Sequence, residues 1–203
     1  SHFDGLAVPI RHLENHHPTA SEFPDADVIL ATFWRTGPIV AQLPTTKGAK
    51  AIFLQGYETS PGHENPEIDA VWRLPLRKIV ISDWMVKLAK DRFGDSDVFH
   101  VPNSVDLDQF HAPPRDKQTV PTVGMLYGSI HLKGVDVTNA ALDLVRREFP
   151  NLRIIAFGAE PITAALPLPK NAEYHLRPRQ ETIRELYAKC DLWVCGSRRE
   201  GFH

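Results

Sequence analysis

The chain has few cysteines and no excess of charge of either sign. Its 203 residues include two cysteines, Cys190 and Cys195. Two are too few for a disulfide scaffold or a four-ligand zinc site, and both lie among apolar residues, so we expect core thiols. The formal net charge is −2, with acidic and basic residues interspersed. A nucleic-acid partner would require a basic face, which this pattern does not supply.

The chain also lacks a long apolar run. Its longest runs have the length of a strand, whereas a membrane-spanning helix needs about 20 apolar residues. Residues 1–5 have neither the charged region nor the apolar stretch of a signal peptide. These features favour a cytoplasmic protein. A chain of this length can bury a core, in one large domain or two small ones.

Short apolar runs predict the strands of the N-terminal half. Strands are expected at four places, which are 28–33, 51–54, 79–81 and 97–101. The run at 28–33 is continuous, which is typical of a strand buried on both faces. A helix is expected after the third strand, with a stripe of four residues: Trp84, Met85, Leu88 and Ala89. Ser82 or Asp83 can cap this helix.

The same alternation restarts after residues 111–121, a segment rich in proline and charge. Strands are expected at 122–127, 152–157 and 192–195. A helix between the first two carries Val137, Ala141, Leu144 and Val145 on one stripe. A second helix at 180–189 carries Ile183, Leu186, Tyr187 and Cys190 at helical spacing.

Strands that alternate with helices predict right-handed βαβ units and parallel sheets. The sequence therefore predicts an α/β protein with two Rossmann-like domains, at 1–110 and 111–203. A linker at about 103–121 is expected between them.

Residues 124–134 join a predicted strand to a predicted helix. Gly124 and Gly134 would let the backbone approach a ligand closely, and the helix N-terminus offers free N–H groups. Lys133 adds a full positive charge, so the segment suits a diphosphate. Taken alone, a solvated lysine beside a turn glycine explains the same pattern.

A second loop follows the last predicted strand. Glu200 and Gly201 lie in it, where a carboxylate could accept hydrogen bonds from sugar hydroxyls. A charged surface turn is the alternative reading of these residues.

Three segments together resemble family 4 glycosyltransferases. Residues 101–110, VPNSVDLDQF, resemble the family's "(I/V)-P-N-G-V-D-x-x-x-F" segment between its two domains, with Ser104 in place of glycine. Residues 124–134 resemble "G-R-L-x-x-x-K-G". Residues 187–202 resemble "Y-x-x-A-D-(hydrophobic)₃-x-P-S-x-x-E-G-F". The order and spacings are compatible with the family, which implies a retaining enzyme with the two-domain GT-B fold, and the first segment would be the hinge.

The resemblance implies the roles of specific residues. Donor-binding positions would be Gly124, Lys133, Gly134, Gly201 and Phe202. Among these, Lys133 would contact the diphosphate of a nucleotide-sugar donor. Glu200 would be the catalytic residue, as the first glutamate of the family's "E-x₇-E" motif, near the transferred sugar. Such enzymes need no metal and no cofactor beyond the donor itself.

The sequence departs from the family pattern at several points. The family's donor-phosphate arginine would fall near Tyr127 or Gly128, and neither supplies charge. Four arginines could compensate: Arg177, Arg179, Arg198 and Arg199. The motif's second glutamate would lie beyond His203, and the family's opening strand and glycine-rich turn would precede Phe3. The chain therefore resembles a partial copy, with each domain incomplete.

The N-terminal half carries a weaker resemblance. Residues 55–58, Gln-Gly-Tyr-Glu, resemble the "Q-D-Y-E" of rhamnosyl- and polysaccharide-type members, where Glu58 could orient an acceptor hydroxyl. His16 and His17 lack partners at ligand spacing, so no metal site is expected there.

The function implied is transfer of a sugar, with retention, from a nucleotide sugar to a glycan or lipid-linked acceptor, as in polysaccharide biosynthesis. A lipid-linked acceptor would imply peripheral association with a membrane. The alternative is a non-catalytic fragment, or a nucleotide- or phosphate-binding module derived from such an enzyme.

Overall fold

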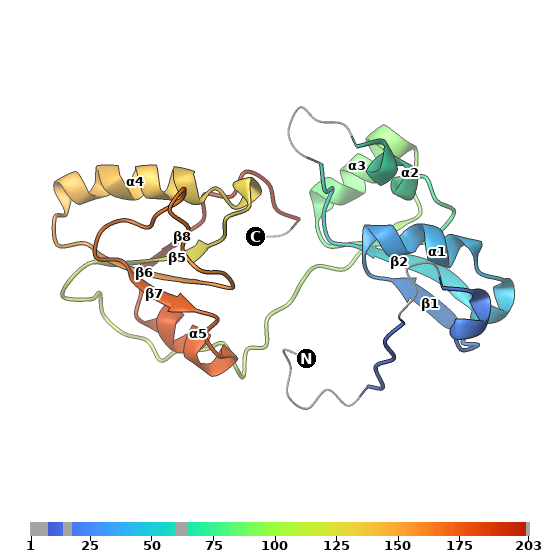
Figure 1. Ribbon diagram of the computed structural model, residues 1–203, viewed down its shortest axis with the longest axis horizontal. Coiled ribbons are helices and arrows are strands. Elements are labelled where there is room, and N and C mark those ends of the chain that lie inside the picture. The colour runs from blue at the N-terminus through green and yellow to red at the C-terminus, as the bar shows by residue number, and fades with distance from the viewer. Residues whose placement is uncertain (1–7, 14–17, 60–64, 202–203) are drawn as a thin grey trace. The chain divides into compact units, whose positions relative to one another are not determined.

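The chain folds into two compact units. The structure is a computed structural model that describes residues 8–13, 18–59 and 65–201. The units divide between Pro102 and Asn103, at the N-terminal end of the predicted linker. Each unit contains one four-stranded sheet, and the strands within it pair in parallel (Figure 1). The predicted α/β class with two Rossmann-like units is confirmed.

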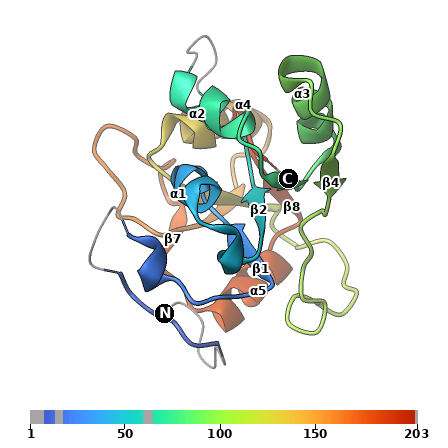
Figure 2. The same cartoon turned by 90° about the vertical axis from the view of Figure 1, so that its right-hand side faces the viewer.

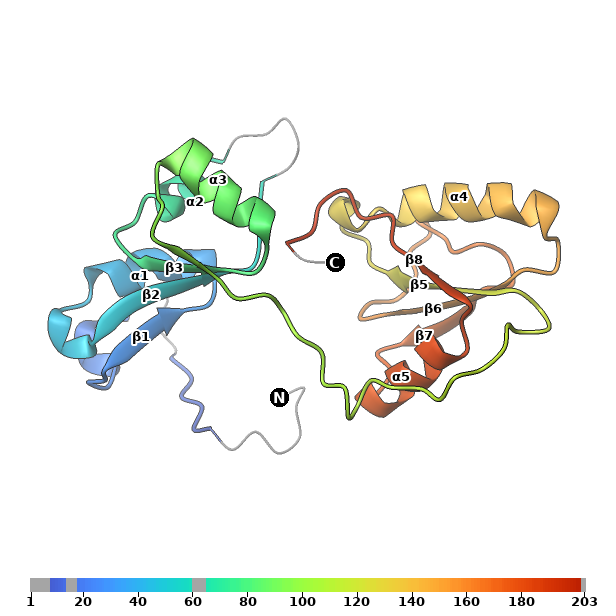
Figure 3. The same cartoon turned by 180° about the vertical axis from the view of Figure 1, so that it is seen from behind.

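Unit 1 has a sheet in the order β1-β2-β3-β4. Its strands are β1 (Val28–Ala31), β2 (Ala49–Leu54), β3 (Arg77–Val80) and β4 (Val98–His100). Its helices are α1 (Gly37–Gln42), α2 (Pro66–Trp72) and α3 (Asp83–Phe93), with short 3-10 turns η1 (Ala20–Glu22), η2 (Trp34–Thr36) and η3 (Thr45–Lys47). Helix α1 contacts β1 and β2 (Figure 2). Helices α2 and α3 lie together above the sheet (Figures 1 and 3).

Two expectations for unit 1 were wrong in detail. Strand β1 is not buried on both faces, because it is an edge strand, and Val28 and Leu30 are exposed. In α3 three of the four predicted stripe residues face the core, with Met85 and Ala89 buried and Leu88 partly buried, whereas Trp84 is 39% exposed. Ser82 occupies the N-cap position of α3 without a capping hydrogen bond from its side chain.

Unit 2 has a sheet in the order β7-β6-β5-β8. Its strands are β5 (Thr122–Tyr127), β6 (Arg153–Gly158), β7 (Glu173–Leu176) and β8 (Leu192–Val194). Its helices are α4 (Val135–Glu148) and α5 (Gln180–Ala188), and the 3-10 turn η4 (His131–Lys133) precedes α4. Helices α4 and α5 cover opposite faces of the sheet (Figures 1 and 3). Strand β7 was not predicted, because it is a short edge strand with a polar sequence.

Side chains of unit 2 alternate between the two faces of its sheet, as the pleat requires. Val123, Met125 and Ile154 pack in the cluster that includes Val135 and Leu142 of α4. Ile155 and Phe157 pack in a second cluster with Leu186 of α5. The predicted stripe of α5 is confirmed at Ile183, Leu186 and Cys190, whereas Tyr187 is 43% exposed.

The predicted stripe of α4 was wrong. Val137, Ala141, Leu144 and Val145 are all exposed. The buried residues are Val135, Thr138 and Leu142, spaced at i, i+3 and i+7. The helix carries apolar residues along two stripes, and the stripe that begins at Val135 packs against the sheet. The expectation of two core thiols also fails in part, because Cys195 is exposed and Cys190 is half-buried.

Part of the predicted linker is fixed to unit 2. The carboxylate of Asp191 accepts hydrogen bonds from the backbone N–H groups of Gln118 and Thr122, at 2.9 Å each. The Arg115 guanidinium donates to the same carboxylate and to the carbonyls of Ala188 and Cys190. These bonds, the backbone donors first, lower the pKa of Asp191. Residues 115–122 therefore belong structurally to unit 2.

Candidate functional site

The strand order of unit 2 creates a reversal between β5 and β8. The chain passes from β5 to β6 and β7 on one side, and returns to pair with β5 on the other side as β8. In open parallel sheets, ligands bind outside the carboxyl ends of strands at such a reversal. Two loops leave the sheet there: 128–134 after β5, and 195–201 after β8. These are the two loops singled out in the sequence.

The two predicted polar residues of these loops meet. The Lys133 Nζ atom donates a hydrogen bond to Glu200 Oε1 at 2.9 Å. Their side chains are 37% and 22% exposed, so the ion pair is partly desolvated but open to solvent. A cation and a carboxylate 67 residues apart in sequence thus share one place at the carboxyl edge of the sheet.

Gly134 and Gly196 bring the two loops into backbone contact. Gly134 has φ 59°, a left-handed conformation that favours glycine, and it lies between η4 and α4. A Cβ atom at Gly134 would overlap the carbonyl oxygen of Gly196. A Cβ atom at Gly196 would lie 2.6 Å from the carbonyl oxygen of Gly134. Glycine at both positions therefore allows an approach that no larger residue permits.

Gly124 has a different environment from Gly134. It lies within β5, directly opposite Trp193 of β8 in the parallel register. A Cβ atom there would overlap the Trp193 ring and would lie 2.8 Å from the Cys190 sulfur. The structure thus gives Gly124 a packing role inside the sheet.

Arg198 is held by the other loop. Its guanidinium makes a two-pronged bond to Asp136, with Nη1–Oδ1 at 2.8 Å and Nη2–Oδ2 at 2.6 Å. Nη1 also donates to the carbonyl of His131 at 2.8 Å. The Arg198 bonds lower the pKa of Asp136 to about 2. The fork of Arg198, one of the expected replacements for the family's phosphate arginine, is therefore engaged by the other loop in this arrangement.

Two of the other three candidate replacements, Arg177 and Arg179, also make hydrogen bonds within unit 2. Arg177 donates through Nε to the carbonyl of Ala159 at 2.7 Å. Arg179 pairs with Glu181, with Nε–Oε2 at 3.3 Å. Tyr127, at one of the two positions expected for the missing arginine, is buried, and its hydroxyl donates to the carbonyl of Leu166.

Glu160 was missed in the sequence. Its carboxylate accepts hydrogen bonds from the Ser129 backbone N–H at 2.5 Å and from the Ser129 hydroxyl at 2.8 Å. These bonds lower the pKa of Glu160, the backbone bond most. Glu160 follows the carboxyl end of β6 by two residues, and that position was the available signal. It fixes the start of the loop that carries Lys133.

The remaining predicted positions divide between described and undescribed residues. Gly201 is described, at the end of the second loop and half-buried. Phe202, His16, His17 and His203 lie outside the described residues. In the parts of the chain that the structure describes, no group of three or more His, Cys, Asp or Glu side chains could hold a metal ion.

Glu58 lies in unit 1, after the carboxyl end of β2. It borders a small cavity of about 50 Å³ that is also lined by Trp34, Gln55 and Trp72. Partial burial raises the pKa of the Glu58 carboxyl. Ligand pockets are typically roughly 300–1,000 Å³, so this cavity does not enclose a sugar. Its aromatic, carboxylate and amide groups can form one edge of an open binding surface for a ligand with apolar faces and hydroxyls.

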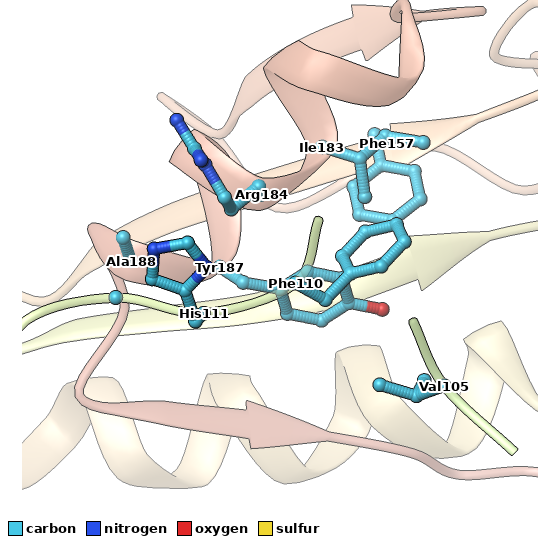
Figure 4. Close-up of a pocket in the computed structure, with 9 residues that line it drawn as sticks. Val105, Phe110, His111, Phe157, Ile183, Arg184, Tyr187 and Ala188 are labelled. Atoms are coloured by element: carbon cyan, nitrogen blue, oxygen red, sulfur yellow. The ribbon is translucent and has the colours of Figure 1, made fainter. Parts of the chain in front are cut away.

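A larger apolar cavity of about 540 Å³ lies within unit 2, away from the Lys133–Glu200 pair. Phe110, Phe157 and Tyr187 line it together, with His111 and Arg184 toward one end (Figure 4). The Phe157 and Tyr187 rings are in edge-to-face contact, with centroids 5.8 Å apart. Val105 also lines it. Val105 and Phe110 of the 101–110 segment therefore border the same cavity of unit 2 as Ile183 and Tyr187 of α5.

No helix in the described parts of the chain combines the length and the apolar character needed to cross a bilayer.

Comparison with known proteins gives a clear result for the fold. No protein-family model matches the chain, and no curated protein sequence matches it. Among solved structures, TarM superposes with a TM-score of 0.73 and 14% identity, over 89% of this chain and 39% of TarM. A Staphylococcus aureus TarM variant, solved with fondaparinux, α-GlcNAc-glycerol and UDP, gives 0.72 and 15% identity over the same shares.

Two further structures agree. The pneumococcal O-GlcNAc transferase GtfA, in complex with UDP and GlcNAc, has a TM-score of 0.65 and 13% identity, over 91% of this chain and 40% of GtfA. The catalytic domain of Arabidopsis thaliana starch synthase IV, bound to ADP and acarbose, has a TM-score of 0.61 and 13% identity, over 87% and 53%. The chain thus spans about two fifths to one half of these proteins. It has the GT-B fold over that part of their length.

Proposed function

We propose that the chain is part of a retaining glycosyltransferase of family 4, which transfers a sugar from a nucleotide-sugar donor to a glycan or lipid-linked acceptor. One observation carries the proposal. The Lys133 ammonium and the Glu200 carboxylate meet at 2.9 Å beside the reversal between β5 and β8. These are the two residues to which the sequence resemblance assigns the diphosphate and the transferred sugar.

The chemistry of the site fits the donor's leaving group. During transfer, the bond between the anomeric carbon and the diphosphate oxygen breaks, and the electron pair stays on the diphosphate. Lys133 and the N-terminus of α4, which carries a partial positive charge, would offset that negative charge. An acceptor oxygen would form the new bond on the same face of the sugar, and its proton would pass to the departing phosphate oxygen.

The neighbouring structures support a nucleoside diphosphate as part of the donor. TarM and GtfA were solved with UDP, and starch synthase IV with ADP. UDP and ADP, the nucleotides of these neighbouring structures, are therefore the probes for this chain. Glu200 would face the sugar, with the backbone of Gly201 and Phe202 beside it, and Gly134 would shape the diphosphate loop.

The acceptor would bind on unit 1. Glu58 and Gln55 lie next to Trp34 at the carboxyl ends of the unit 1 strands, and these side chains suit the hydroxyls and the apolar face of a sugar. An acceptor carried on a lipid would bring a cytoplasmic enzyme to the membrane surface.

Substitution of Lys133 tests the donor site. Lys133→Ala should weaken UDP or ADP binding about 10- to 150-fold, because it removes a charge-assisted contact of about 1.5–3 kcal/mol. Isothermal titration calorimetry measures this effect. Lys170→Ala is the matched control, because Lys170 is an exposed lysine of the same unit in the turn before β7. Equal affinity of the parent and Lys133→Ala would contradict the proposed site.

The alternative is a nucleotide- or phosphate-binding module without catalysis, derived from such an enzyme. Both versions predict nucleotide binding. An enzyme would release free sugar from a nucleotide sugar or transfer the sugar to an oligosaccharide, whereas a binding module would do neither. The Glu200→Gln variant should lose this activity.

A further inference from the structure

We propose that Arg198 and Asp136 are positioning residues, whose ion pair holds the loop after β8 so that Glu200 reaches Lys133. Only the effect of the pair on donor binding rests on the proposed function. Its structural content concerns four residues of unit 2 and can be tested without any ligand.

The first argument is the number of bonds that Arg198 makes to the opposite loop. Its side chain bonds both carboxylate oxygens of Asp136 and the carbonyl of His131. Its backbone N–H donates to the carbonyl of Leu132 at 2.9 Å. Arg198 thus fastens the loop after β8 both to η4 and to the first turn of α4. A planar fork with fixed donors suits this task, and lysine would not reproduce it.

The second argument is that the residues two positions before and two positions after Arg198 also contact the η4–α4 segment. Two residues earlier, Gly196 lies so close to α4 that an added Cβ would meet the backbone of Gly134 and Thr138. Two residues later, Glu200 bonds Lys133. Every second residue of 196–200 therefore contacts the η4–α4 segment, and Arg198 is the central attachment of the three.

The third argument is the short separation of Asp136 and Lys133, which lie three residues apart on consecutive elements. Lys133 ends η4, and Asp136 is the second residue of α4, three positions later. The Arg198–Asp136 bond thus sets the distance between Glu200 and the turn that carries Lys133. The side chain of Asp136 is 51% exposed, so its pairing with Arg198 is not imposed by burial. We infer that the pair positions the loop after β8, and with it Glu200, relative to Lys133.

Amide hydrogen exchange tests the positioning role in the full 203-residue chain. Asp136→Asn and Arg198→Lys should both increase exchange at residues 196–201, while exchange in β5 and the later turns of α4 stays unchanged. Glu181→Gln is the matched control, because it removes an acidic partner of an arginine, Arg179, at the N-terminus of α5 instead. Asp136→Glu should restore part of the protection. Unchanged exchange at 196–201 in both variants would overturn the inference, as would a general increase across unit 2.

Calorimetry with UDP and ADP then separates this inference from the proposed function. If the parent binds either nucleotide, Asp136→Asn and Arg198→Lys should bind it roughly 1.4- to 5-fold more tightly, because a released loop no longer holds Glu200 on Lys133. Glu181→Gln should bind it as the parent does. Faster exchange with unchanged affinity would refute the role in donor binding. If the parent binds neither nucleotide, the proposed function fails, and the exchange experiment alone decides whether the pair holds the loop.

Discussion

Gly124 and Trp193 are directly opposite each other on β5 and β8, and the indole ring occupies the space that a Cβ at Gly124 would need. Trp193 in turn packs against Phe157 and Tyr187, with ring centroids 5.2 and 4.3 Å away. The join between the two strands that flank the candidate site therefore depends on the absence of a side chain at one position.

Gly124→Ala should destabilise unit 2 by about 1–3 kcal/mol, the usual cost of overpacking a core. Urea unfolding followed by far-ultraviolet circular dichroism measures the change, because Trp193 is the one tryptophan of unit 2 and is itself substituted in the double variant. The double variant Gly124→Ala/Trp193→Leu should lose less than the sum of the two single variants, because the smaller side chain removes the overlap. Additive losses of unfolding free energy would show that the Trp193 ring is not what opposes a Cβ at residue 124.

Glu200→Gln should strengthen the binding of UDP or ADP by roughly 1.4- to 5-fold. The carboxylate bonds Lys133 in the structure, so a diphosphate must compete with it for the ammonium group. Partly exposed ion pairs are worth about 0.2–1 kcal/mol, which sets this range. Calorimetry at low and high salt checks it, since the gain should shrink as salt screens the charges. Weaker binding in Glu200→Gln would mean that the nucleotide itself contacts the carboxylate.

Two leucines of α4 should respond differently to truncation. Leu142 is 1% exposed in the core of unit 2, so Leu142→Ala should cost about 2–5 kcal/mol. Leu144 is 58% exposed, so Leu144→Ala should change the unfolding free energy by about 0.5 kcal/mol at most. Denaturant unfolding of the two variants compares them directly. Similar losses of unfolding free energy in the two variants would show that the stripe predicted from the sequence, which includes Leu144, is buried.

The Arg198–Asp136 pair should make the unfolding free energy depend on pH in the acidic range. The pKa of Asp136 is lowered from 3.8 to about 2 in the folded chain, so its contribution is complete above pH 4 and is lost as the pH falls toward 2. The unfolding free energy of the parent should therefore drop more between pH 4 and pH 2 than that of Asp136→Asn. Other carboxylates, such as Asp191, titrate in both proteins, so the difference between the curves isolates Asp136. Parallel curves would contradict the pairing.

Much of the fold could be predicted from periodicity. The strand at 122–127 was predicted at its exact bounds, and the buried residues Met85, Ala89 and Leu186 were placed on the correct helix faces. Predictions failed where the pattern was compatible with two structures. Helix α4 has two apolar stripes, and β7 is too short and polar to show a period. The helices α1 and α2 have six and seven residues, which is too short for a recognisable repeat.

The candidate site was predicted in part. Lys133, Gly134 and Glu200 were identified from short motifs, because those motifs sit at strand ends, where parallel sheets bind ligands. Glu160 and Asp136 were not identified, since each acts through a partner far along the chain. Their bonds to Ser129 and Arg198 span 31 and 62 residues.

The sequence by itself determined the alternation of strands and helices, the two Rossmann-like units and the two loops that carry the charged residues. These follow from local periodicity and from glycine, proline and charge at fixed positions. Only the tertiary structure decided that Gly124 makes room for Trp193, that Arg198 is engaged by Asp136, and which stripe of α4 faces the sheet. The physical reason is the same in each case: the interaction depends on which segments the sheet order brings together, and that order is set by the packing of the whole unit.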